Sequence, residues 1–146
     1  MAWLKSKLSW SLSANAAPLR GSSIRVPESL PVHRPEVIAQ LAGELSAVSD
    51  ALRYRDNFAR LLPQRIETLA AEVGSRDQEA AVSTLLTLNV GSSMVGAPRL
   101  EHVVAQCLAD VRGGRRTICL PTLVREAERF LAYLAETNNA GRADRR

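Results

Sequence analysis

The centre of the chain carries the stretch that decides the fold, Val82-Ser83-Thr84-Leu85-Leu86-Thr87-Leu88-Asn89-Val90-Gly91-Ser92-Ser93-Met94-Val95-Gly96-Ala97. Small or apolar side chains recur there at intervals of three or four residues, a stripe made of Ala81, Leu85, Leu88, Ser92 and Val95. This spacing places the stripe on one face of a helix. Ser75 followed by Gln78 is a capping-box pattern, so we expect the helix to begin at that pair. We expect it to end at Gly96-Ala97-Pro98.

Two runs of apolar residues precede the stretch, the first made of Ile38, Leu41, Leu45, Val48 and Leu52 and the second of Phe58, Leu62, Ile66, Leu69 and Val73. Both have the helical period, so they predict two amphipathic helices. The first covers 35–52 and opens at Pro35, a residue suited to a first helical position. The second ends at Gly74. We expect Pro63 to bend it, because the proline ring removes one backbone hydrogen bond.

Two more runs follow the stretch, the first made of Leu100, Val103, Val104, Cys107, Leu108 and Val111 and the second of Leu123, Val124, Ala127, Phe130, Leu131 and Leu134. Gly113-Gly114 separates them, and Pro121 opens the last helix. Five helical segments are thus joined by short loops, and no strand pattern is present. Short connections favour antiparallel neighbours. The sequence therefore predicts an all-α protein, an antiparallel up-down four-helix bundle with an additional N-terminal helix.

The 146-residue chain has enough length for one domain with a core, which we place at residues 35–138. The formal net charge of +4 lies in residues 1–34, whose charged residues are Lys5, Lys7, Arg20, Arg25, Arg34 and Glu28. We expect residues 1–34 to be a flexible basic tail and residues 139–146 a disordered C-terminal tail. A positive charge confined to a tail is weak support for nucleic-acid binding, so we expect no nucleic-acid partner.

The N-terminal residues leave two interpretations open. Trp3, Leu4, Leu8 and Trp10 fall roughly on one side of a helix, which could touch a membrane surface or a partner. The alternative is a disordered leader. The serines among residues 8–17 make a poor signal peptide, and no run of 18 apolar residues exists to span a membrane. With two isolated cysteines, Cys107 and Cys119, these features predict a cytoplasmic protein.

The segment from Leu86 to Ala97 resembles the signature of the histidine phosphotransfer (Hpt) domain, the four-helix module that relays phosphoryl groups in two-component signalling. That signature runs H-x-L-K-G-S-S-x-x-x-G-A, and four of its positions are matched here, by Leu88, Ser92, Gly96 and Ala97. Leu61-Leu62-Pro63-Gln64-Arg65-Ile66 also looks like the second helix of Hpt domains, where such a proline is frequent. With the order of the helices, the resemblance covers about residues 35–137 and implies the Hpt-like bundle.

The positions of the signature that carry chemistry are replaced. Leu86 stands where the phosphoryl-accepting histidine belongs, Asn89 where the lysine belongs and Val90 where the following glycine belongs. A register shifted by one residue puts Thr87 at the histidine position and Asn89 at a core position. Neither register contains a histidine. The resemblance therefore implies a phosphotransfer fold without its phosphotransfer chemistry.

Other residues offer little in place of the missing nucleophile. Phosphoryl transfer needs an exposed imidazole nitrogen, and Thr87 has no base within a helical turn to activate its hydroxyl. His102 lies on a different helix, where an ordinary surface or half-buried histidine is expected, and His33 lies in the tail. No metal-ligand spacing, phosphate-cradling loop or pair of carboxylates stands out. We expect no enzyme activity, no metal and no cofactor.

One surface is left for a partner. The residues beside the inner stripe are Val82, Leu86, Asn89, Val90 and Ser93, which occupy the face where Hpt domains dock a receiver domain. Apolar residues on a face that is expected to be exposed to solvent form a candidate interaction surface. The leading hypothesis is a non-catalytic Hpt-like adaptor that binds a response-regulator receiver domain. One alternative is that the fold itself covers these residues, with the 35–52 helix or with a second copy of the chain. The others are a helical scaffold that self-associates through the same face, as a homodimer for example, and an active phosphotransferase that uses His102.

Overall fold

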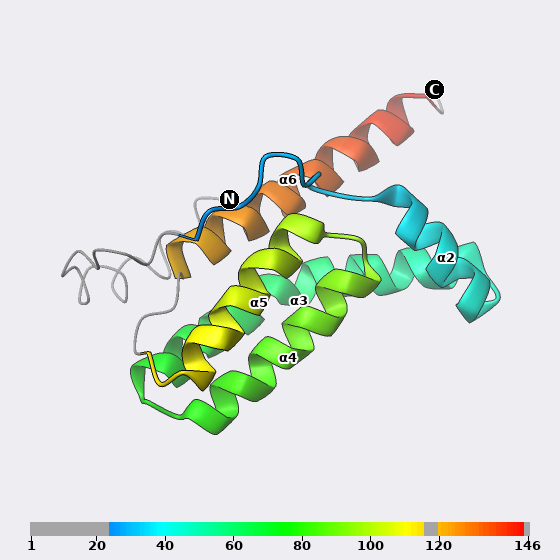
Figure 1. The fold of residues 1–146 in the computed structure, drawn as a ribbon. Helices are drawn as coiled ribbons and strands as arrows, with labels where there is room; N and C mark the ends of the chain where they lie inside the picture. Colours follow the sequence, from blue (N-terminus) through cyan, green and yellow to red (C-terminus); the bar gives the residue numbers. More distant parts are fainter. Residues whose placement is uncertain (1–23, 116–119, 145–146) are drawn as a thin grey trace.

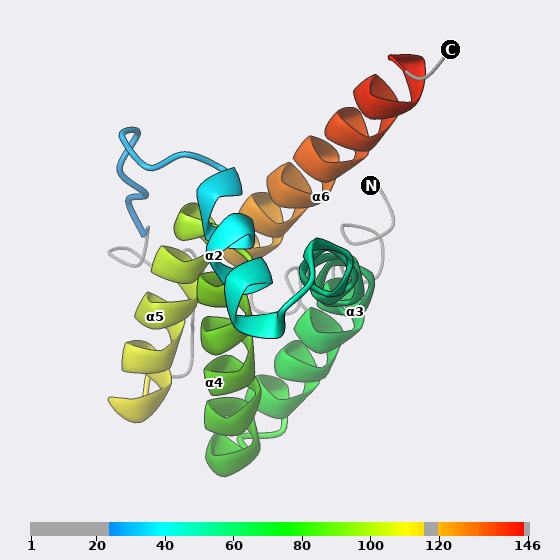
Figure 2. The ribbon, with the colours of Figure 1, turned by 90° about the vertical axis from the view of Figure 1, so that its right-hand side faces the viewer.

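The structure is a computed structural model, and it describes residues 24–115 and 120–144. Within these ranges all regular structure is helical and no strand occurs. The helices are α2 (Pro35–Leu45), α3 (Val48–Gly74), α4 (Gln78–Met94), α5 (Pro98–Arg112) and α6 (Leu120–Ala143). Figure 1 shows α4 and α5 side by side, and the C-terminal part of α6 extends beyond the other helices in both views (Figures 1 and 2). The predicted all-α class is confirmed.

The helices meet in a closed sequence of contacts. α3 packs against α4, α4 against α5, α5 against α6, and α6 returns to α3. α2 packs on α3 and touches α4. The core between them contains every residue of the predicted inner stripe of α4, the whole predicted stripe of α5, and all of the predicted stripe of α6 except the half-buried Leu131. The helical period in the sequence thus identified the buried faces of these three helices.

The first predicted helix, over 35–52, is wrong, because two helices share that segment. α2 ends at Leu45, and Ser46 takes a left-handed conformation with φ of 65° that a right-handed helix cannot contain. The chain turns there, and α3 starts at Val48. The turn also exposes the apolar residues around it to solvent. Leu45, Val48 and Leu52 are 41%, 64% and 36% exposed instead of facing the core.

The long helix α3 contains Pro63 in its interior. A proline there cannot donate a backbone hydrogen bond, and its ring pushes on the preceding turn. Figure 2 looks down the first part of α3 and shows the second part leaving in a different direction. The bend lets the helix pack against α2 with its first part and follow α4 with the rest.

The start of α4 differs from the predicted capping box. The N-cap residue is Asp77, whose side chain accepts a hydrogen bond from the backbone N–H of Ala80 at 3.2 Å. Ser75 belongs to the end of α3, and its hydroxyl donates to the carbonyl of Glu72. An aspartate at this position also suits the positive end of the helix dipole, so it replaces the serine as the cap.

The structure describes part of each predicted tail. Ile24, Val26 and Val32 pack against the core, and His33 is only 8% exposed. At the other end, α6 continues to Ala143 with exposed side chains, through most of the segment expected to be a disordered tail. The candidate amphipathic segment 2–11 and Cys119 lie outside the described residues. No helix in the described part of the chain is long and apolar enough to cross a membrane.

Candidate docking face on α4

The five residues proposed for partner binding lie on α4 at spacings that place them on one side of the helix. They differ in exposure. Leu86 and Val90 are 40% and 56% exposed, and Ser93 is also exposed. Val82 is half-buried and packs against the core, and Asn89 is half-buried. We call these five residues the docking face, and its apolar centre consists of Leu86 and Val90.

The docking face belongs to a long uncharged segment. From Ala80 to Ala97 the chain contains no acidic, basic or histidine residue. Hydroxyl groups are the only candidate nucleophiles on α4, and Thr87 has its hydroxyl engaged, since Oγ1 donates to the carbonyl of Ser83 at 3.1 Å. Without an imidazole or a cation, the docking face offers apolar contact and hydrogen bonding but no group suited to accept a phosphoryl group.

The two histidines lie elsewhere. His102 is half-buried on α5. His33 precedes α2, and its Nε2 lies 3.0 Å from the carbonyl oxygen of Val95, a residue of the buried stripe. Its ring also lies near the rings of Phe130 and Tyr133 on α6. This burial could not be predicted from the sequence, because His33 stands in a proline-containing segment without a periodic pattern.

The residues that match the Hpt signature are buried and have structural roles. Leu88, Ser92 and Ala97 are fully buried. Ser92 donates its hydroxyl to the carbonyl of Leu88, so the polar group is satisfied inside the helix. Gly96 has φ of +72°, and a Cβ there would lie 2.6 Å from the carbonyl oxygen of Arg34. Only glycine fits that turn between α4 and α5.

Gly91 faces the interior, although its neighbour Val90 is exposed. A Cβ on Gly91 would lie 2.5 Å from Cε2 of Phe58 on α3. The small size of Gly91 is therefore required by the packing of α3 against α4. It is not a gap left for a partner on the outer face. This placement bears on the register of the signature, because the shifted alignment needs Gly91 to be that gap.

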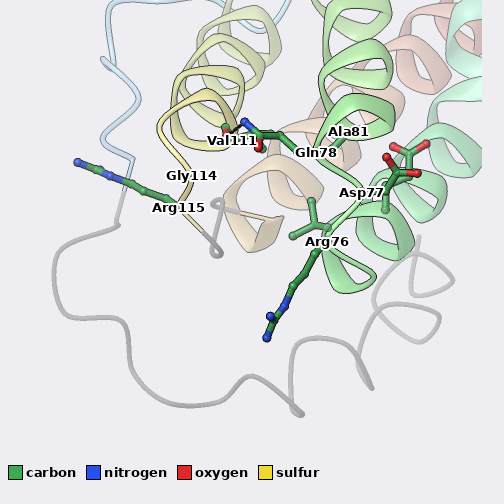
Figure 3. Close-up of a pocket in the computed structure, with 9 residues that line it drawn as sticks. Arg76, Asp77, Gln78, Ala81, Val111, Gly114 and Arg115 are labelled. Atoms are coloured by element: carbon green, nitrogen blue, oxygen red, sulfur yellow. Dashed lines mark hydrogen bonds between the residues drawn. The ribbon is translucent and has the colours of Figure 1, made fainter.

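A separate hollow of about 180 Å³ lies at the N-terminal end of α4 (Figure 3). Among the residues that the structure describes, its lining includes Glu72 and Asp77 and contains no histidine or cysteine. Gln78 donates from Nε2 to the carbonyl of Val111 across one side of it, at 3.0 Å. Figure 3 shows the side chains of Arg76 and Arg115 extending outward. One of its carboxylates is hydrogen-bonded, because Thr84 donates from Oγ1 to Oε1 of Glu72 at 3.0 Å.

Nowhere in 24–115 or 120–144 do three His, Cys, Asp or Glu side chains come together in a group that could hold a metal ion. No family model, curated protein or solved structure matches the chain.

Proposed function

We propose that this protein is a non-phosphorylating, Hpt-like adaptor that binds the receiver domain of a two-component system through the docking face of α4. The observation that carries the proposal is the exposure of Leu86 and Val90 on a helix with no charged residue from Ala80 onward. The adaptor holds or competes for a receiver domain and takes no phosphate from it. Receiver domains act in the cytoplasm, which is where the proposal places this chain.

The architecture supports an antiparallel up-down four-helix bundle made of α3, α4, α5 and α6. These four helices contact one another in a ring, and the connections from α3 to α4 and from α4 to α5 each contain only three residues. Such short connections force neighbouring helices to run in opposite directions. α2 is then the additional N-terminal helix of the Hpt-like arrangement, although it is shorter than expected.

The exposure pattern of α4 supports the ungapped register of the Hpt signature. An acceptor histidine must be reachable from solvent, and Leu86, at that position, is exposed, whereas Leu88 is fully buried, as a core position requires. The shifted register would make Gly91 the partner-facing glycine, but Gly91 is packed against Phe58. The loss of phosphoryl acceptance is then assigned to three outward or half-buried positions, Leu86, Asn89 and Val90.

Burial of the apolar centre of the docking face would contribute part of the free energy of binding a partner. Full burial of a Leu or Val side chain contributes about 1.5–3 kcal/mol, and both centre residues keep a large part of that surface in water. A partner that covers them gains on the order of 1 kcal/mol from each, before any hydrogen bonds to Asn89 or Ser93. The rest of the binding free energy must come from other contacts, because association also costs translational and rotational freedom.

Calorimetric titration of the purified chain with a panel of receiver domains tests the proposal. We expect at least one receiver domain to bind, and Leu86→Glu or Val90→Glu to weaken binding by about tenfold or more, because each puts a charge into an apolar contact. The matched control is Ala105→Glu, at an exposed position of α5. Equal affinity of all variants, or no binding to any receiver domain, would contradict the proposal.

Self-association remains a second candidate, and one observation favours it. The turn between α2 and α3 exposes Leu45, Val48 and Leu52, so the surface has a second apolar group besides the docking face. Apolar groups of this kind often mark contacts between chains. Light scattering after size exclusion separates the candidates. A monomer leaves the docking face open for a receiver domain, whereas a tight dimer that Val48→Glu dissociates supports self-association through the second apolar group.

A further inference from the structure

His33 occupies a buried site formed by several helices. It is 8% exposed, and its ring centroid lies 6.0 Å from that of Phe130 and 5.3 Å from that of Tyr133. Its Nε2 lies 3.0 Å from the carbonyl oxygen of Val95. A carbonyl only accepts, so Nε2 must carry the proton and donate it. The other ring nitrogen, Nδ1, is buried and has no hydrogen-bond partner.

His33 belongs to residues 24–34, a segment that we call the N-terminal strap. Several contacts besides those of His33 hold this strap against the helices. The backbone N–H of Arg34 donates to the carbonyl of Gly96 at 2.7 Å. Arg99 donates from Nη1 to the carbonyls of Pro27 and Leu30, each at 3.3 Å. Apolar side chains of the strap pack on the core. These contacts attach the strap along its length, with His33 at the end next to α2.

The charges around His33 disfavour a second proton on the ring. Burial lowers the pKa of His33 below its ordinary 6.5, and Arg55 on α3 lowers it further, whereas the Val95 carbonyl and Glu36 on α2 act in the opposite direction. α6 contributes the phenol ring of Tyr133. α4 contributes no ionisable group near the site, since none occurs beyond Glu79.

We propose that His33 is an acid-sensitive latch: the neutral ring holds the strap on the bundle, and protonation releases it. A second proton would reside on Nδ1, where no acceptor receives it and little water reaches it. The charged ring is more stable in water than in this site. Release of the strap is therefore coupled to the uptake of one proton.

The sign of the pH dependence follows from this coupling. Well above pH 6.5 the ring is neutral in both states, and the strap is held fully. As the pH falls below 6.5, the released state takes up the proton and the attached state does not, so attachment weakens by up to about tenfold per pH unit. Below the lowered pKa of the attached ring both states are protonated, and the weakening stops.

Hydrogen exchange of the full-length chain, followed by mass spectrometry and corrected for the intrinsic effect of pH, tests the latch. Between about pH 8 and about pH 5 we expect protection of residues 24–34 to fall by about tenfold or more, while the buried part of α5 keeps its protection. The variant His33→Gln can still donate to Val95 but cannot titrate, so its strap should show no pH dependence. The control His102→Gln should behave as the wild type does.

Two results would overturn the latch. One is strap protection that is independent of pH in the wild type, and the other is a pH dependence that persists in His33→Gln. If His33→Gln leaves the strap detached at every pH, an NMR titration of the His33 ring in the wild type decides instead. A ring pKa at or above 6.5 contradicts the proposal, whereas a lower pKa with strap opening in the same pH range supports it.

Discussion

Gly91 of α4 lies directly against the ring of Phe58 of α3, and this contact sets how closely the two helices approach. A Cβ on Gly91 would be 2.5 Å from Cε2 and 2.7 Å from Cδ2 of Phe58. The phenyl ring cannot easily move away, because it is buried and packs edge-on against the ring of Phe130 of α6. The two ring centroids are 6.0 Å apart. The glycine is thus part of the core, one residue away from the exposed Val90.

The substitution Gly91→Ala should therefore lower the free energy of unfolding by about 1–3 kcal/mol, because overpacking outweighs the better helix propensity of alanine. Chemical denaturation measures the change. Gly141→Ala in α6 is the matched control, since no heavy atom lies within 4 Å of its added Cβ, and it should be neutral or slightly stabilising. A loss that persists unchanged when Phe58→Leu is added would show that the ring is not the cause.

The N-terminal strap should contribute to the stability of the bundle. We expect a chain lacking residues 1–33 to melt more than about 5 °C below a chain lacking residues 1–23. The difference reflects the loss of the apolar contacts of Ile24, Val26 and Val32 and of the hydrogen bonds that His33 and Arg99 make. Calorimetry measures both melting temperatures, and equal values would show that the strap is a flexible tail, as the sequence had suggested.

Arg99 and Glu126 form a buried ion pair between α5 and α6. Nε and Nη2 of Arg99 donate to the two carboxylate oxygens at 2.9 and 3.0 Å, and the Glu126 side chain is only 1% exposed. The variant Arg99→Met leaves a buried carboxylate without its main partner, so it should cost about 3 kcal/mol. Changing Glu126 to Met as well should recover most of that loss.

The control for this pair is Arg129→Met. Arg129 approaches the same carboxylate at 3.6 Å, but its side chain is 51% exposed, so its removal should cost less than about 1 kcal/mol. Denaturation curves of the variants give the comparison. An equal loss in the free energy of unfolding for Arg99→Met and Arg129→Met would mean that the buried arginine stabilises the protein no more than the exposed one does.

The sequence identified those helices whose apolar residues keep one period from end to end. α5 and α6 have such stripes, and α4 has one along its buried side, so their core residues were predicted correctly. The prediction of one helix over residues 35–52 was wrong, because Leu45, Val48 and Leu52 continue the spacing of three or four residues across the turn at Ser46. A pattern counts intervals and cannot detect that the backbone has reversed direction.

The sequence also could not reveal what depends on tertiary contacts. The strap has no periodic face, and it is held by hydrogen bonds from distant residues, such as Arg99 to the carbonyl of Leu30. The pairing of Arg99 with Glu126 joins two helices and leaves no local pattern. On the docking face, spacing placed Leu86 and Val90 outside the inner stripe, but only the structure separated them from the half-buried Val82 and Asn89.

We propose that this protein has the docking geometry of a phosphotransfer domain without its acceptor. Restoring Leu86→His, Asn89→Lys and Val90→Gly places nucleophile, cation and gap at i, i+3 and i+4 on one face of α4. Two of these residues are exposed and one is half-buried, so the fold should survive, although the glycine costs about 1 kcal/mol. Thr87→His serves as the control for the shifted register.

The decisive measurement is transfer of labelled phosphate from a phosphorylated receiver domain that binds the wild type. We expect acid-labile label on the triple variant and none on the wild type or on Thr87→His. Label on the wild type would contradict the absence of an acceptor, and label on Thr87→His alone would contradict the register. A folded triple variant that binds the receiver domain but stays unlabelled would contradict the claim of phosphotransfer geometry itself.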